Sequence, residues 1–172
     1  MKNFLISGLA LSLLMGCGQA EQSTAGEAKA QNYSWSLVTT WPKNFPVLGT
    51  GANQLADLIT EMTDGRVKVK VYGAGELVPA FEVFDAVSRG TAQMGHGAAY
   101  YWKGKIEEAQ FFSTVPFGMN AQEMTSWLYY GGGLEDAQAL YNKYDMQLVG
   151  WWVYGQESLA SSKPIRNADD FK

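Results

Sequence analysis

Aromatic rings and hydrogen-bonding groups occur together at three places along the sequence. Trp41 follows a β-prone segment, and His96 with residues 100–102 (Tyr-Tyr-Trp) follows another. Gln156 follows a third, the apolar run over residues 147–154. A cleft for a small molecule is typically lined by aromatic surfaces with a few convergent polar groups. The pattern therefore favours binding of a small molecule at these positions.

The sequence holds few of the groups that catalysis needs. His96 is the only histidine, and the only cysteine, Cys17, lies in a leader segment. The folded chain therefore has neither a Cys–His pair nor a histidine metal cluster. A Ser–His–Asp set using His96 is allowed by residue count, but no Gly-x-Ser-x-Gly turn accompanies it. We expect a protein that is not an enzyme, with His96 either hydrogen-bonded on the floor of the cleft or in contact with a ligand.

Alternating strand and helix patterns predict how these residues are positioned. The expected strands cover residues 33–40, 67–72, 92–95 and 147–154, and the expected helices cover residues 48–62, 81–88, 121–130 and 135–144. This alternation predicts a parallel sheet covered by helices, with right-handed crossovers. The carboxyl ends of parallel strands meet at one edge, where α/β proteins bind ligands, so we expect Trp41, His96 and Gln156 to converge there. A competing interpretation places the strand aromatics, such as Trp152, in the core.

Two local signals refine this picture. Asn120, followed three residues later by Glu123, predicts a capping box at the start of a helix. Glu76 lies in the loop after the second expected strand, from which its side chain could reach the cleft.

The N-terminal segment has the pattern of a lipoprotein leader. Lys2 precedes an apolar run over residues 4–15, which is too short to cross the ~30 Å hydrocarbon core of a membrane as a helix. The run leads into Leu-Met-Gly-Cys17, which resembles the lipobox of bacterial lipoproteins, where the cysteine is acylated. We expect residues 1–17 to be a lipoprotein signal peptide with Cys17 as the lipid attachment site, and residues 18–32 to be a flexible tether. The alternative for Cys17 is an unmodified cysteine after an ordinary signal peptide.

Composition and charge narrow the classes of partner. Of the 172 residues, 47% are hydrophobic, which is enough for a sizeable core. The formal net charge is −4, and charges of both signs are scattered along the chain. Because a nucleic-acid-binding protein needs a basic patch or stripe, we expect no nucleic acid partner.

Four sequence runs carry a family resemblance. They are YYWKGK at 100–105, VPFGM at 115–119, AQEM at 121–124 and WLYYGGG at 127–133. These runs resemble the substrate-binding proteins of TRAP (tripartite ATP-independent periplasmic) transporters, and more narrowly the branch that includes the 2-oxo acid receptors. Residues 162–165 and 168–172 are similar to the segment that follows the hinge in this family.

The resemblance implies a fold and a domain organisation. It implies an α/β, periplasmic binding protein-like lobe with a mixed, mainly parallel sheet flanked by helices. Residues 33–152 would form this first lobe. Residues 153–172 would form a hinge strand and the start of a second lobe, which the 172 residues do not complete.

The resemblance also implies a function. The protein would be an extracytoplasmic receptor on the periplasmic side of a bacterial membrane, delivering a small carboxylate to a membrane permease. A 2-oxo acid such as pyruvate, held with sodium or calcium, is what the branch suggests. Other organic acids (C4-dicarboxylates, hydroxy acids or sugar acids) remain alternatives, and a structural surface lipoprotein is a further one.

Site residues follow from the resemblance position by position. Gln156 would contact the ligand carboxylate and serve as a cation ligand, and Tyr100, with Tyr101 as the alternative, would face the ligand. The arginine that pairs with the carboxylate in this family would fall a few residues beyond Lys172. A guanidinium binds a carboxylate through two parallel hydrogen bonds, so this residue would contribute strongly to affinity.

Overall fold

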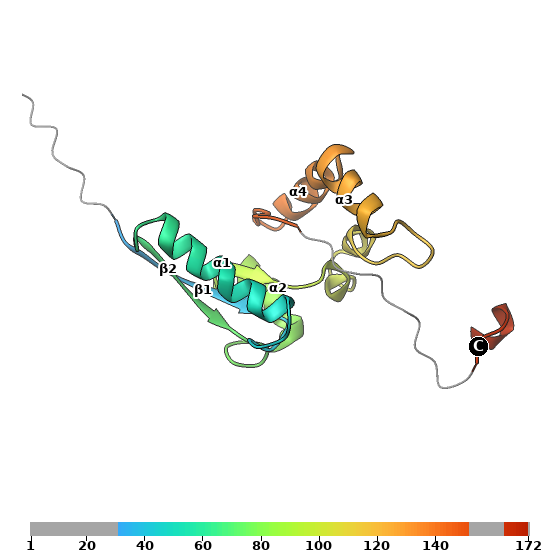
Figure 1. The fold of residues 1–172 in the computed structure, drawn as a ribbon, viewed down its shortest axis with the longest axis horizontal. Coiled ribbons are helices and arrows are strands. Elements are labelled where there is room, and N and C mark those ends of the chain that lie inside the picture. The colour runs from blue at the N-terminus through green and yellow to red at the C-terminus, as the bar shows by residue number, and fades with distance from the viewer. Residues whose placement is uncertain (1–30, 152–163, 172) are drawn as a thin grey trace, which may run out of the picture. The chain divides into compact units, whose positions relative to one another are not determined.

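The computed structural model describes residues 31–151 and 164–171. Its elements, with η for 3₁₀ helices, are β1 (Tyr33–Thr39), α1 (Leu48–Met62), β2 (Val67–Tyr72), η1 (Ala80–Glu82), α2 (Val83–Ser88), β3 (Met94–His96), η2 (Ala99–Trp102), η3 (Glu107–Phe112), α3 (Ala121–Tyr130), α4 (Gly133–Asn142) and η4 (Ala168–Phe171) (Figure 1). No helix in these described ranges is long and apolar enough to cross a membrane.

The described strands form a parallel three-stranded sheet with β1 in the middle, in the order β2-β1-β3. The register places Leu37 opposite Val71 of β2 and Thr39 opposite His96 of β3. Parallel neighbours need a crossover connection. Here α1 connects β1 to β2, and the segment η1–α2 connects β2 to β3.

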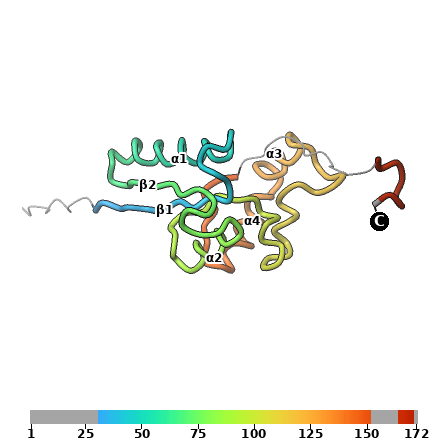
Figure 2. The backbone as a smooth tube through the Cα atoms, turned by 90° about the horizontal axis from the view of Figure 1, so that it is seen from below, coloured from blue at the N-terminus to red at the C-terminus, as the bar shows by residue number. Residues whose placement is uncertain are grey.

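Helices cover both faces of this sheet, with α1 on one side and α2 on the other (Figure 2). Leu37 and Val71 pack with Ala52 of α1, whereas Val38 packs with Val83 of α2. Successive strand residues point to opposite faces, and both Leu37 and Val38 are only 1% exposed. The apolar character of β1 thus comes from burial on both faces, as in other parallel sheets.

The later helices extend the core that begins beneath α2. Leu128 of α3 and Tyr141 of α4 belong to the same buried cluster as Phe84, Trp102 and Phe112. The ring of Tyr141 lies 6.1 Å from that of Trp102 and 6.5 Å from that of Phe84, measured between centroids. This aromatic packing connects α4 to η2 and α2.

The capping box expected at residue 120 is present at the start of α3. The side chain of Asn120 accepts hydrogen bonds from the backbone N–H groups of Gln122 and Glu123, both at 3.0 Å. The carboxylate of Glu123 in turn accepts from the Asn120 N–H at 2.9 Å.

Most expected elements are confirmed, with shifted ends. The expected helix over 48–62 and strand over 67–72 have the bounds of α1 and β2, and β1 ends one residue early. The third strand was expected over residues 92–95, but β3 begins at Met94. Ala92 lies in a bend before it, where its buried N–H donates to Ala86 O at 3.0 Å. The helix that we expected from residue 135 begins at Gly133, because Gly132 adopts a left-handed φ of 89° at its N-cap.

The strand predicted over residues 147–154 is wrong for its described part, since residues 147–151 form no strand. Instead, the side chain of Gln138 in α4 forms hydrogen bonds with the backbone of this segment and of the residue before it. Its Oε1 accepts from Leu148 N at 2.9 Å, and its Nε2 donates to Met146 O at 3.2 Å. The remaining residues of that prediction, 152–154, lie outside the described residues.

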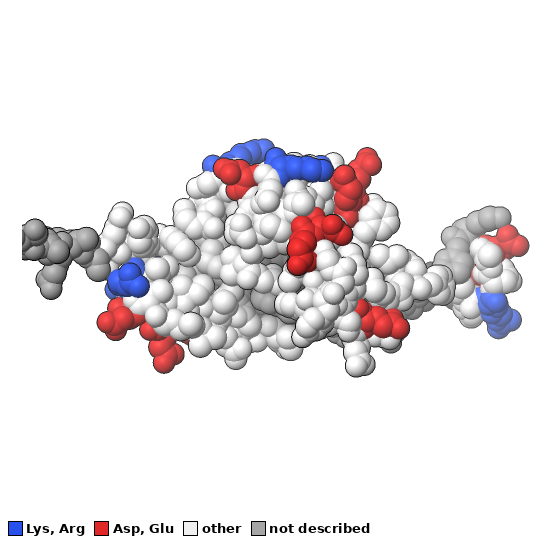
Figure 3. Space-filling view, turned by 90° about the horizontal axis from the view of Figure 1, so that it is seen from above, with Lys and Arg blue, Asp and Glu red and all other residues white. Residues whose placement is uncertain are grey.

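The surface charges agree with the sequence pattern. Figure 3 shows basic and acidic side chains interspersed on the face in view, with no continuous basic stripe there. Arg89 and Lys105 both pair with Asp85, which joins α2 to the turn after η2.

Candidate functional site

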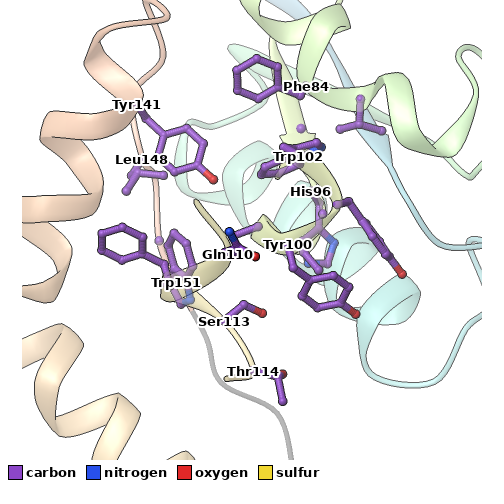
Figure 4. Close-up of a pocket in the computed structure, with 18 of the residues that line it drawn as sticks. Phe84, His96, Tyr100, Trp102, Gln110, Ser113, Thr114, Tyr141, Leu148 and Trp151 are labelled. Carbon is purple, nitrogen blue, oxygen red and sulfur yellow. The ribbon is translucent and has the colours of Figure 1, made fainter. Parts of the chain in front are cut away.

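A cleft of about 1410 Å³ opens beside the carboxyl ends of β1 and β3. One wall carries Trp41, His96 and the η2 residues Tyr100 and Tyr101. The facing wall comes from η3, the segment after it, α4 and residues 146–151 (Figure 4).

Trp41 is held in place by the chain around it. The hydroxyl of Thr39 accepts a hydrogen bond from Trp41 N at 3.2 Å and donates one to Trp41 O. Lys43, two residues on, pairs with Glu76 at 2.6 Å, and Asn53 of α1 donates to Lys43 O at 3.1 Å. The hydrogen bond from Lys43 lowers the pKa of Glu76 below its usual value. The loop after β1 is thereby tied to α1 and to the loop after β2.

Glycine at position 49 permits this close packing. A Cβ there would lie 2.1 Å from Pro42 O and 2.7 Å from Lys43 O, closer than real contacts allow. The start of α1 can approach the loop that carries Trp41 only because residue 49 has no side chain.

His96 stands at the end of β3, directly against Trp41. The two ring centroids lie 4.8 Å apart with planes tilted by 52°. Burial lowers the pKa of His96 from 6.5 to about 4, because a buried imidazole resists taking up charge. His96 is therefore neutral at pH 7 and offers hydrogen bonds rather than positive charge to a ligand.

Tyr100 and Tyr101 extend the aromatic wall along η2. Their rings meet edge to face at 4.7 Å, and Tyr101 also lies 6.4 Å from Trp41 and 5.2 Å from Phe81, again between centroids. Edge-to-face aromatic packing contributes about 0.5–1.5 kcal/mol per pair beyond burial. Packing of this kind fixes the rings as a rigid surface at the cleft.

The facing wall supplies neutral polar groups that the sequence reading missed. Gln110, Ser113 and Thr114 line the cleft together with the aromatic ring of Trp151 (Figure 4). The ring of Phe112 also lines it. The polar triplet lies in and just after a 3₁₀ helix, where no strand or helix period marks which side chains face inward.

The structure brings together four of the five predicted ligand residues. Trp41, His96, Tyr100 and Tyr101 share one wall of the cleft. The fifth, Gln156, lies outside the described residues, as does Cys17. Glu76 is not among the described residues that line the cleft, because its carboxylate pairs with Lys43.

The described residues were compared with the ligands that a cation site needs. They contain no group of three or more His, Cys, Asp or Glu side chains that could hold a metal ion. No Asp or Glu occurs among the described residues that line the cleft. Hard cations such as Ca²⁺ prefer several oxygen ligands including carboxylates.

Comparison with known proteins decides the family. The family model of bacterial extracellular solute-binding proteins, family 7 (DctP), matches residues 37–172. The chain belongs to this family. Membership of DctP confirms the fold class expected from the sequence and the expectation of a binding protein rather than an enzyme.

Three relatives of this DctP chain are informative. A monocarboxylate 2-oxoacid-binding periplasmic protein from Nostoc sp. is 38% identical over 169 residues, which cover 91% of this chain and 45% of the relative. A TRAP periplasmic solute-binding protein from Pseudoalteromonas atlantica, solved with sodium and pyruvate, is 45% identical with a TM-score of 0.64. One from Colwellia psychrerythraea, solved with calcium and pyruvate, is 43% identical with the same TM-score of 0.64. Each of these two matches covers 66% of this chain and 35% of the solved chain. The chain thus spans less than half the length of the relatives that it matches.

Proposed function

We propose that this protein is an extracytoplasmic solute receptor of a TRAP transporter that binds a small monocarboxylate. A 2-oxo acid such as pyruvate is the ligand class that we favour. The observation that carries the proposal is the convergence of Trp41, His96, Tyr100 and Tyr101 on one wall of the cleft. The named ligands of the relatives support the choice of ligand class.

The chemistry of the described wall suits one part of such a ligand. Hydroxyl and imidazole groups between aromatic rings suit a small polar molecule with a carbonyl group and a short apolar end. The wall supplies little positive charge, because His96 is neutral at pH 7 and the lysine on the cleft lining, Lys103, is exposed.

A buried carboxylate needs compensating charge. We propose that a sodium or calcium ion, with Gln156 among its ligands, and basic groups from the rest of the protein supply it. Gln156 would contact both the carboxylate and the cation. The described lobe would then position the ligand, and the remainder of the protein would neutralise it.

The partner and the location are parts of the same proposal. The receptor would act on the periplasmic side of a bacterial membrane and deliver its ligand to the membrane permease subunits. Acylation at Cys17 would hold it on the membrane, with residues 18–32 as the tether. In this organisation residues 33–152 belong to the first lobe and residues 153–172 lead into the second.

Ligand titration of the complete gene product tests the proposal. Intrinsic tryptophan fluorescence is followed while pyruvate is added, with and without sodium or calcium. We expect a saturable change that requires a cation, because Trp41 lies on the ligand-facing wall. Succinate, lactate and a sugar acid are titrated in parallel. Saturation by one of these instead would assign another organic acid, and a folded protein that responds to none would contradict a receptor for small carboxylates.

A further inference from the structure

The aromatic wall of the cleft rests in part on a very short helix. Tyr100 and Tyr101 belong to η2, which has only four residues, and 3₁₀ helices have poorer hydrogen-bond geometry than α-helices. At the end of η2, Lys103 N donates to Tyr100 O at 3.4 Å, beyond the usual 2.7–3.2 Å for such bonds. The backbone of η2 therefore holds the two tyrosines weakly, and their orientation depends on what packs against this helix.

The segment η1–α2 packs against η2 through two pairs of rings. Phe81 meets Tyr101 edge to face at 5.2 Å, and Phe84 lies 5.6 Å from Trp102, both measured between centroids. Phe84 and Trp102 are buried, whereas Phe81 is 65% exposed. The inner contact is thus well anchored in the core. The outer contact, beside the tyrosines of the wall, is open to solvent and constrains them less.

An ion pair joins the same two segments just beyond Trp102. Asp85 of α2 follows Phe84 directly, and its carboxylate accepts a hydrogen bond from Lys105 Nζ. The backbone of Lys105 is fixed as well, because its N–H donates to Trp102 O at 2.8 Å and its carbonyl accepts from the Tyr144 hydroxyl at 3.3 Å. Lys105 therefore connects α2, the end of η2 and the turn after α4.

The two cations beside Asp85 make different contributions. The side chain of Asp85 is only 18% exposed, whereas those of Lys105 and Arg89 are 42% and 75% exposed. A partly buried carboxylate needs a compensating charge. Arg89 follows α2 directly and lies 3.5 Å from Asp85, so this contact stays within one stretch of the chain. Only the contact with Lys105 passes a positional constraint from α2 to η2.

We infer that Lys105 and Asp85 are positioning residues for the cleft: their ion pair holds η2 in the orientation that presents Tyr100 and Tyr101 to the ligand. The inference rests on the proposed function, because it takes these two rings as a surface that contacts the ligand. It also gives a role to the run YYWKGK at 100–105, which contains both the tyrosines and the lysine that holds them.

Removal of this ion pair should loosen the outer part of η2 more than the core. The buried contact between Phe84 and Trp102 remains, and exposed ion pairs contribute little to global stability. The free energy of unfolding should therefore change little, while Tyr100 and Tyr101 lose their fixed orientation. A pair that served only the stability of the fold would affect ligand binding no more than it affects unfolding.

Fluorine NMR of the complete gene product, labelled with 3-fluorotyrosine and free of ligand, tests the positioning role. Tyr100→Phe and Tyr101→Phe assign the two resonances. In Lys105→Met we expect both resonances to move toward the shift of free 3-fluorotyrosine, whereas Arg89→Met, which removes the other cation beside Asp85, should leave them in place. Unchanged resonances in Lys105→Met, or equal changes in Arg89→Met, would overturn the inference. Should Lys105→Met fail to fold, Asp85→Asn provides the same comparison with the shape of the side chain preserved.

Pyruvate titration of the same variants measures the consequence for binding. We expect Lys105→Met to bind roughly tenfold more weakly than wild type, and Arg89→Met and Lys105→Arg to bind within about twofold of it. Urea unfolding of each variant separates this effect from a loss of stability. If wild type binds pyruvate and Lys105→Met binds it equally well, the inference is wrong. If wild type binds no carboxylate, the proposed function fails, whereas the fluorine resonances still report whether the ion pair orients the two rings.

Discussion

The indole of Trp41 lies against the imidazole of His96, although the two residues belong to different strand ends. The register explains the contact, because Thr39 of β1 stands opposite His96 of β3. The backbone N–H of Thr40 donates a hydrogen bond to His96 O, and Trp41 follows Thr40 directly. Their ring centroids are 4.8 Å apart. The parallel pairing of two short strands thus creates the aromatic wall of the cleft.

Replacing Trp41 with alanine should weaken pyruvate binding to the complete gene product by roughly tenfold. The change removes a ring that contacts His96 and Tyr101, and an aromatic pair contributes about 0.5–1.5 kcal/mol. Isothermal titration calorimetry measures the affinity. Tyr130→Ala, on an exposed aromatic, should leave it unchanged. Equal affinities for wild type and Trp41→Ala would remove Trp41 from the site.

Replacing Gln156 with alanine should weaken binding by at least tenfold and reduce the dependence on the cation. The predicted role of this amide is to contact both the carboxylate and the cation, and a hydrogen bond to a charged group contributes about 1.5–3 kcal/mol. Titrations over a series of sodium and calcium concentrations separate the two effects. An unchanged affinity at every cation concentration would exclude Gln156 as a ligand.

The stability of the protein should fall between pH 6.5 and pH 4 because of His96. Its pKa is about 4 in the folded state, so the unfolded chain takes up the proton first as the pH falls. The stabilisation is fully present above pH 6.5 and is lost progressively down to about pH 4. One pKa unit corresponds to about 1.4 kcal/mol, which gives a loss of at most about 3 kcal/mol. Urea unfolding of wild type and His96→Gln across this range provides the measurement, and parallel pH profiles would contradict the assignment.

Alanine substitutions at Gly49 and Gly51 should change the stability of the protein in opposite directions. Gly49→Ala places a Cβ 2.1 Å from Pro42 O, and we expect a loss of several degrees in melting temperature together with weaker ligand binding. At Gly51, also within α1, a Cβ would meet nothing within 4 Å. Gly51→Ala should stabilise the helix by about 0.5–1 kcal/mol. Differential scanning calorimetry compares the two, and similar shifts for both variants would refute the close packing at Gly49.

Loss of the capping box should destabilise α3. Asn120→Ala removes acceptors for two backbone N–H groups, which typically costs about 0.5–2 kcal/mol. Gln122→Ala, an exposed change in the same turn, is the matched control and should alter the free energy of unfolding by less than about 0.5 kcal/mol. Chemical denaturation of both variants distinguishes a capping effect from a general effect of alanine in this turn.

Local sequence patterns predicted the sheet, the helices and the aromatic wall, because each depends on short-range chemistry. Strand alternation, helical periodicity and the Asn120 cap are all encoded within a few residues. Trp41 and His96 could be placed together because parallel strands bring their carboxyl ends to one edge. The wall residues Gln110 and Ser113 could not, since their inward direction depends on how an irregular segment packs.

The strand predicted at residues 147–154 failed for a different reason. Apolar and β-branched composition favours a buried strand, but a strand also needs a neighbour to complete its hydrogen bonds. In the described part of the chain, Leu148 N bonds to the side chain of Gln138 instead. The predicted burial is also wrong for the described residues, since Leu148 and Trp151 are only half-buried and Val149 is 72% exposed. The missing partner could not be deduced from the segment itself.

The central position of β1 has a consequence for how the protein is made. Of the described strands, β1 is the first to leave the ribosome, and both of its neighbours are synthesised after it. Roughly 60 further residues must follow before β3 is complete, which takes roughly 3–12 s at ~5–20 residues per second. During that interval Leu37 and Val38 are apolar and incompletely paired, a state that invites strand pairing between chains. The segment that is most deeply buried in the finished sheet is therefore the one most exposed to aggregation during synthesis.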